Sequence, residues 1–74
     1  MILVILKDCP SCAIIKSKFP NWTPRFYSDC SASEINFIKE QMKKYKMDKF
    51  PVAYNEELTR FYTADDIVRL LSVL

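Results

Sequence analysis

The chain has 74 residues, which limits it to a single domain over residues 1–74, and half of them are hydrophobic, which favours a core in so short a chain. A net charge of +2 is too small to indicate a nucleic-acid partner, and the absence of glycine excludes the glycine-rich loops that bind phosphates and dinucleotides. No apolar stretch is long enough for a membrane span or a signal peptide, so we expect a cytoplasmic protein without a membrane partner.

The first residues predict a strand followed by a helix. Residues 1–6 are continuously apolar and rich in β-branched side chains, which is typical of a strand buried on both faces. From Cys9 to about Phe19 the pattern predicts a helix, with Pro10 in its first turn, where a missing N–H does no harm. Pro20 ends this helix. The side chains that we expect to pack on the sheet are Ala13, Ile14, Ile15 and Phe19.

A loop, a short strand and a longer helix follow. We expect residues 21–24 to form a loop and residues 25–28 to form a strand with two aromatic residues as its body. Ser31 or Ser33 can cap a helix over about residues 32–46. In that helix apolar residues recur at steps of three and four, which predicts one packing stripe. Its members are Ile35, Ile38, Met42 and Tyr45.

The last part of the chain predicts a hairpin and a helix. Residues 50–54 and 58–62 have the composition of strands, around a turn at residues 55–56. Thr63 can cap the final helix, and two aspartates in its first turn interact favourably with the partial positive charge at the start of this helix. Its buried side is expected to consist of Ile67, Val68, Leu70, Leu71 and Leu74. The element order is therefore β-α-β-α-β-β-α, which predicts an α/β fold with a four-stranded mixed sheet and helices on both faces.

The main chemical signal is the Cys-Pro-Ser-Cys motif at the junction of the first strand and the first helix. The first turn of a helix presents unpaired N–H groups and a partial positive charge, so a sulfur at Cys9 is stabilised as the thiolate. The thiolate is the attacking species in disulfide exchange. Cys12 lies one turn further along the same side, where it can attack a mixed disulfide on Cys9 and release the product. The spacing therefore predicts redox chemistry.

Other interpretations of the cysteines stay open. A Cys-x-x-Cys pair is also half of a zinc ribbon, but a structural zinc site needs four ligands. The chain has no histidine and only Cys30 besides the pair, so such a site would need a carboxylate or a second subunit. The pair can also be two inert core thiols. Cys30 itself is expected to be a small buried hydrophobic residue, or else a regulatory or intermolecular thiol.

The chain resembles the glutaredoxins, which have the thioredoxin fold. The matching segments are the Cys-Pro-Ser-Cys motif after the first strand, residues 50–52 before the hairpin, and residues 63–66 at the start of the last helix. The resemblance covers nearly the whole chain in element order. It implies that Cys9 is the nucleophile and that Cys12 resolves the intermediate. It also implies that the peptide bond before Pro51 is cis and that this proline faces the active-site sulfur.

The resemblance further implies a site for glutathione. The backbone of Phe50 would pair with this peptide-like molecule as an added strand. The turn at Ala64 and Asp65 would hold its γ-glutamyl end, and Lys7 corresponds to the lysine that binds its glycine carboxylate. The implied substrate-binding residues are Lys7, Pro10, Ser11, Phe50, Pro51, Ala64 and Asp65.

Several positions differ from the family pattern. Ser11 stands where the family has an aromatic residue, and Phe50 stands where it has valine. Thr63 and Ala64 replace a pair of glycines. Lys7 lies two residues before the first cysteine rather than three, and it can equally be a solvated lysine at a strand end.

These features predict a dithiol–disulfide oxidoreductase that reduces protein or glutathione mixed disulfides. We expect a monomer without a bound cofactor, with glutathione as co-substrate and a disulfide-containing protein as partner. An enzyme of the thioredoxin-reductase type is the alternative electron donor, and ribonucleotide reductase is one acceptor that the resemblance suggests. The competing class is a non-enzymatic module that binds zinc, an iron–sulfur cluster or a protein partner. The lysines of the second helix and Lys49 form either a solvated face or a surface that steers an anionic partner or tripeptide.

Overall fold

The computed structural model describes residues 1–73, which form an α/β structure with three α-helices and a four-stranded mixed sheet. This confirms the predicted order of elements. The strands are β1 (Ile2–Ile5), β2 (Thr23–Phe26), β3 (Val52–Tyr54) and β4 (Phe61–Tyr62). The helices are α1 (Pro10–Lys18), α2 (Ala32–Tyr45) and α3 (Ala64–Leu71), with a 3₁₀ helix η1 (Tyr27–Asp29) after β2.

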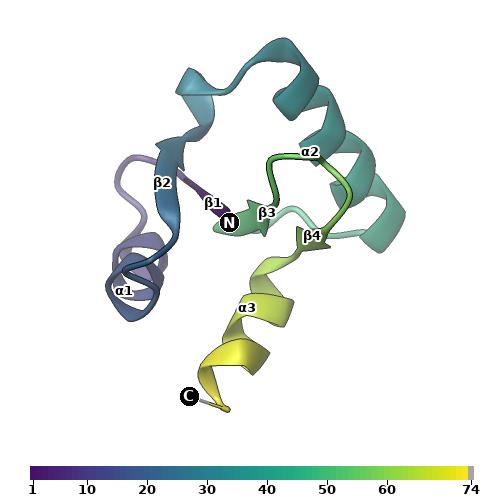
Figure 1. Cartoon of the computed structure of the whole chain (residues 1–74). Coiled ribbons are helices and arrows are strands. Elements are labelled where there is room, and N and C mark those ends of the chain that lie inside the picture. The colour runs from purple at the N-terminus through teal and green to yellow at the C-terminus, as the bar shows by residue number, and fades with distance from the viewer. Residues whose placement is uncertain (74) are drawn as a thin grey trace.

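The sheet has the strand order β2-β1-β3-β4, which places β1 and β3 inside and the other two strands at the edges (Figure 1). β1 is parallel to β2 and antiparallel to β3, and β3 is antiparallel to β4. Leu3 lies between Pro24 of β2 and Ala53 of β3. The carboxyl end of β1 leads directly into the loop that carries the two cysteines, so a fully buried inner strand positions the motif.

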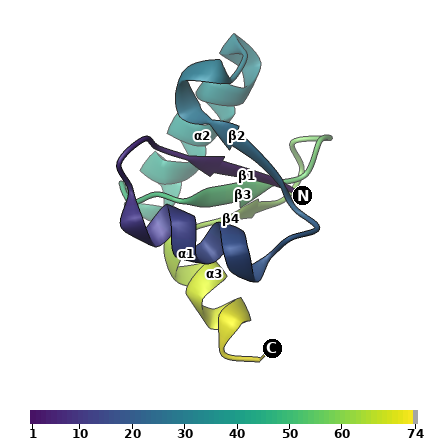
Figure 2. The same ribbon diagram turned by 90° about the vertical axis from the view of Figure 1, so that its left-hand side faces the viewer.

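The helices cover both faces of the sheet, as predicted. Helices α1 and α3 lie together on one face, and α2 lies on the other (Figure 2). Successive residues of β1 point to opposite faces, so all four of its side chains are buried, in agreement with its continuously apolar sequence. The core on the α1 and α3 side contains Leu3, Ile5, Cys12, Ile15, Ala53 and Ile67. The core on the α2 side contains Ile2, Val4, Ile38, Val52 and Tyr54.

Strand β2 differs from its predicted position. The strand occupies residues 23–26, not 25–28, and it includes two residues of the predicted loop. Residues 27–29 form η1 instead. Pro24 is tolerated because β2 is an edge strand, where a missing N–H can face away from the sheet. A proline in a mostly exposed segment looks like a loop in the sequence, and only the pairing with β1 shows that it is a strand.

The predicted packing faces of the helices are wrong at several positions. On α1, Ala13 and Ile14 are exposed, whereas Cys12 and Ile15 are buried. On α3, Val68 is exposed while Ile67 is buried. Tyr45, predicted in the stripe of α2, is exposed as well. Leu74, predicted on the buried side of α3, lies outside the described residues.

Two helices begin with the predicted capping residues. The Ser31 hydroxyl accepts a hydrogen bond from the backbone N–H of Glu34, whose carboxylate accepts one from the N–H of Ser31. Thr63 and Asp66 form the same reciprocal pair at α3. Each pair satisfies N–H groups that a helix start leaves free. None of the helices within residues 1–73 combines the length and the apolar character that a bilayer span needs.

The end of α2 shows how a chain without glycine makes a left-handed turn. Lys46 follows the helix with φ 54° and ψ 42°, a conformation that is unfavourable for a residue with a Cβ atom. Replacing Lys46 by Gly should therefore stabilise the fold by about 0.5–1 kcal/mol, measured by urea unfolding. Lys44→Gly is the matched control inside the helix, and it should destabilise by about 1 kcal/mol. Equal effects of the two changes would contradict this account of the turn.

Candidate active site

Cys9 is the N-cap residue of α1. Its sulfur accepts a hydrogen bond from the backbone N–H of Cys12 over 3.3 Å, and its carbonyl accepts one from the N–H of Ala13. Pro10 occupies the first helical position, as predicted, and the first turn contains no acidic side chain. The sulfur of Cys9 therefore lies at the positive end of the helix next to a backbone donor, an arrangement that stabilises a thiolate.

The two cysteines of the motif are joined as a disulfide, with 5.2 Å between their Cα atoms. They differ in access to solvent. Cys9 is partly buried, whereas only 2% of Cys12 is exposed. The hydroxyl of Ser11 lies 3.5 Å from the sulfur of Cys9. An incoming molecule can therefore reach Cys9, while Cys12 is available only to the sulfur of Cys9.

One cavity next to Cys9 is formed by the loop at the cis proline and the start of α3. Its volume is about 460 Å³.

 The Phe50–Pro51 peptide bond is cis, as the resemblance implied. We call this space the proline cavity, and its walls are Leu6, Cys9, Ser11, Ile15, Lys49, Phe50, Pro51, Ala64, Asp65 and Val68.

A second cavity, of about 700 Å³, meets the disulfide from the side of β1, α1 and β2. Its walls are Ile5, Leu6, Lys7, Asp8, Cys9, Pro10, Cys12, Ala13, Lys16 and Phe26. The two cavities share Leu6 and Cys9. Cys9 therefore lines both spaces, and each space is bounded by different elements of the fold.

The structure divides the predicted substrate-binding residues between these two cavities. Five of them line the proline cavity together with Cys9, namely Ser11, Phe50, Pro51, Ala64 and Asp65. Lys7 and Pro10 line the second cavity instead. The lysine in the wall of the proline cavity is Lys49, which the sequence assigns only to a solvated face or to a surface that steers an anionic partner. The position of Lys49 two residues before Pro51 is the one signal in the sequence that could have indicated a role in substrate binding.

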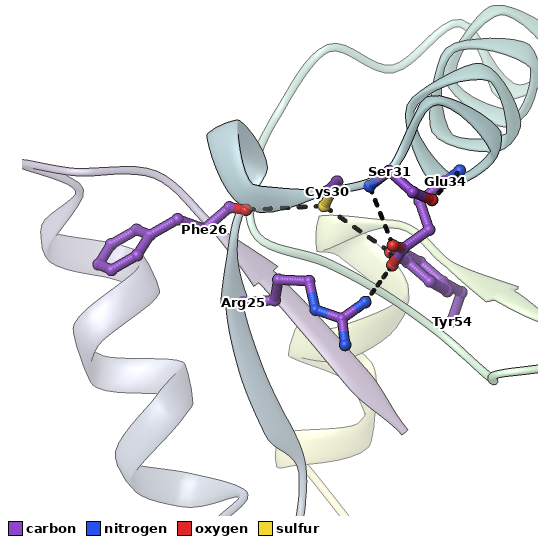
Figure 3. Close-up of polar contacts among 6 residues, drawn as sticks. All are labelled: Arg25, Phe26, Cys30, Ser31, Glu34 and Tyr54. Carbon is purple, nitrogen blue, oxygen red and sulfur yellow. Dashed lines mark hydrogen bonds and ion pairs between the residues drawn. The ribbon is translucent and has the colours of Figure 1, made fainter.

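A polar network that the sequence does not reveal lies on the other side of β2 (Figure 3). The carboxylate of Glu34 accepts hydrogen bonds from the guanidinium of Arg25 and the hydroxyl of Tyr54. The Cys30 sulfur lies 3.8 Å from the Tyr54 hydroxyl and donates to the carbonyl of Phe26 over 3.6 Å. The network links β2, η1, α2 and β3, so it fixes the end of β2 relative to the core.

The network shifts the pKa values of its members. Burial alone would raise the pKa of Glu34, but the hydrogen bonds from Tyr54, Ser31 and Arg25 outweigh it and lower that pKa to about 2. Burial, together with the hydrogen bond to Glu34, raises the pKa of Tyr54. Burial also raises the pKa of the Cys30 thiol, which favours its protonated, less reactive form. Cys30, predicted as a small buried residue, is only partly buried and packs against the core on the α2 side.

Within residues 1–73, no three side chains of His, Cys, Asp or Glu gather into a group that could hold a metal ion. Comparison with family models, with curated proteins and with solved structures found no match to the chain.

Proposed function

We propose that the chain is a dithiol–disulfide oxidoreductase with a thioredoxin-like fold of the glutaredoxin type. The observation that carries this proposal is the pair at the start of α1, with an accessible Cys9 that caps the helix and a buried Cys12 within disulfide reach. The strand order β2-β1-β3-β4, with β1 parallel to β2 and antiparallel to β3, is compatible with that fold.

The proposed reaction is two successive thiol–disulfide exchanges. The Cys9 thiolate attacks one sulfur of a substrate disulfide, which forms a Cys9–substrate disulfide and releases the other sulfur as a thiolate that takes up a proton. Cys12 then loses its proton and attacks the sulfur of Cys9, which releases the second substrate thiol and leaves the Cys9–Cys12 disulfide. Two electrons pass from the dithiol to the substrate. Glutathione or a reductase of the thioredoxin-reductase type returns two electrons to the pair.

The proline cavity is the proposed site of glutathione. Its volume of about 460 Å³ lies within the range of roughly 300–1,000 Å³ that is usual for small-molecule sites. Glutathione carries two carboxylates and one ammonium group, and the cavity wall offers Lys49 and Asp65 as groups of opposite charge. Lys49 thus takes the role that the resemblance gave to Lys7.

Reversal of the charge at Lys49 tests this assignment. Lys49→Glu should raise the KM for a peptide–glutathione disulfide, with reduced glutathione as the electron donor, roughly threefold to tenfold, because an exposed charge contact contributes only modestly to binding. Lys44→Glu makes the same change in net charge on α2, away from the cavity walls, and should leave that KM unchanged. An equal rise in both variants would mean that only the overall charge matters.

The test of the function itself is a turnover assay. The chain is mixed with a peptide–glutathione disulfide and an excess of reduced glutathione, and the released peptide is measured by chromatography. Release of many peptide molecules per molecule of protein supports an oxidoreductase. Release at the rate seen without protein overturns the proposal. Replacement of glutathione by a thioredoxin reductase with its reductant shows which donor returns the electrons, and ribonucleotide reductase can then be tried as acceptor.

A further inference from the structure

The second cavity continues along the sheet beyond the disulfide. A third cavity, of about 240 Å³, shares Ile5, Leu6, Lys7 and Phe26 with it and extends to Tyr27 and Ser28. We call the two together the lysine groove. The groove runs from Cys12 and Lys16 on α1 to the start of η1. A small disulfide at Cys9 contacts only the larger of the two cavities, whereas a segment of polypeptide can occupy both.

The groove exposes apolar side chains close to the reactive sulfur. Leu6 is 40% exposed and Phe26 is 39% exposed, although both are large hydrophobic residues. Figure 3 shows the ring of Phe26 pointing away from Cys30 and Arg25. Exposed apolar side chains gathered beside a functional group are typical of a surface that binds another molecule. The occupant should therefore present an apolar side chain near its disulfide.

The charges of the groove favour an occupant that carries negative charge. Its walls carry Lys7 and Lys16 and a single acidic side chain, Asp8. The positive end of α1 adds to this charge, because the first turn of that helix has no acidic residue. An acidic residue close to the substrate cysteine is complementary to this surface, and a basic one is repelled.

Phe26, which lines both cavities of the lysine groove, is held in place by the polar network around Glu34. The carbonyl of Phe26 accepts the hydrogen bond of Cys30, and Tyr54 beside this thiol is fully buried. The pKa of the Cys30 thiol is raised by burial, so the donor proton is retained at neutral pH. A wall that is already ordered loses little conformational entropy when a partner binds.

We propose that the lysine groove binds the acidic and apolar segment next to a cysteine of a protein disulfide, and so makes the chain selective among protein substrates. This inference rests on the proposed function, since the bound disulfide is the one that Cys9 attacks. The bond changes are those given above: the substrate disulfide is reduced to two thiols, and the Cys9–Cys12 dithiol is oxidised to a disulfide.

The test uses four synthetic peptides, each supplied as its own disulfide-linked dimer. They differ only at the two residues before the cysteine, which are Glu-Leu, Glu-Ala, Lys-Leu or Lys-Ala. The reduced chain should reduce the Glu-Leu dimer about tenfold faster in kcat/KM than the Lys-Ala dimer, because one charge contact and one apolar contact differ. Lys7→Glu/Lys16→Glu, at two exposed positions, should reverse the Glu-over-Lys preference. Phe26→Ala should remove the Leu-over-Ala preference.

The matched control is Lys39→Glu/Lys44→Glu, which changes the net charge equally but lies on α2, and it should keep the preferences of the parent chain. Equal rates for all four peptides would overturn the inference, as would a Glu preference that survives the charge reversal at Lys7 and Lys16. In both cases the reduction of glutathione disulfide by the same protein would leave the proposed function intact. If neither the peptides nor glutathione disulfide were reduced, the proposed function itself would fail.

Discussion

Replacing Cys9 by Ser is expected to abolish disulfide exchange, so that the rate falls to that of the solution without protein. A serine hydroxyl does not ionise near neutral pH and cannot replace the attacking thiolate. Cys12 cannot take over the attack, because only 2% of it is exposed. The measurement is the release of peptide from a peptide–glutathione disulfide. Full activity of Cys9→Ser would show that Cys9 is not the nucleophile.

Replacing Cys12 by Ser should have a different result. Cys9 can still attack, but no second sulfur resolves the intermediate, so a glutathione adduct on the protein should accumulate and be visible by intact mass. Cys30→Ser is the matched control, since Cys30 is the third cysteine of the chain and forms no disulfide. It should still form the Cys9–Cys12 disulfide and reduce glutathione disulfide. If Cys30→Ser lost that reaction while Cys9→Ser kept it, Cys30 would be the reactive cysteine.

Replacing Glu34 by Ala should cause a large loss of stability. Its carboxylate accepts hydrogen bonds from Arg25, Ser31 and Tyr54, and the Tyr54 residue is fully buried. A buried hydroxyl without its acceptor costs about 1–3 kcal/mol, and the lost ion pair adds to this, so we expect about 2–3 kcal/mol. The total stability of a chain of this size is about 4–11 kcal/mol. Urea unfolding at pH 7 measures the difference.

Glu40→Ala is the control for this change, because Glu40 is exposed on the same helix. It should alter the free energy of unfolding by less than about 0.5 kcal/mol. Equal effects of the two substitutions would show that the network does not stabilise the fold.

The same carboxylate should make the fold sensitive to acid. The pKa of Glu34 is about 2 in the folded chain, below its ordinary value of 4.5. A lowered pKa in the folded state stabilises the chain above the ordinary value, and this stabilisation is lost as the pH falls from about 4.5 towards 2. Unfolding curves at pH 6 and pH 3 should therefore differ more for the parent chain than for Glu34→Gln. Parallel changes in both proteins would contradict this assignment.

The sequence predicts the order of the elements because their signals are local. The apolar run of β1, the caps at Ser31 and Thr63 and the change of period before β3 each lie within a few residues. Strand β2 has no such signal. Its residues are mostly exposed and include Pro24, so its position depends on pairing with β1, which is a tertiary contact.

In the candidate site, too, some features follow from local sequence and others depend on the tertiary structure. The position of Cys9 at the start of the first helix follows from its neighbours in the sequence, and in the structure Cys9 is the N-cap residue of α1. The position of Lys49 beside Cys9 does not follow from the sequence, because the two lie forty positions apart in the chain and only the fold brings them to one cavity. The network of Arg25, Glu34 and Tyr54 likewise joins three different elements. A motif shows the reactive group, but the residues around it come from the tertiary structure.

The central claim is that Cys9 and Cys12 form one two-electron couple that exchanges with external disulfides. The most direct measurement is a redox titration in glutathione buffers, in which thiols are blocked with an alkylating mass tag and counted by intact mass. We expect a single transition in which the chain loses two reactive thiols together, at a potential between about −200 and −270 mV, the range from glutaredoxins to thioredoxin. A pair that stays reduced throughout, or that is protected from alkylation by a bound metal, would contradict the claim and favour a binding module.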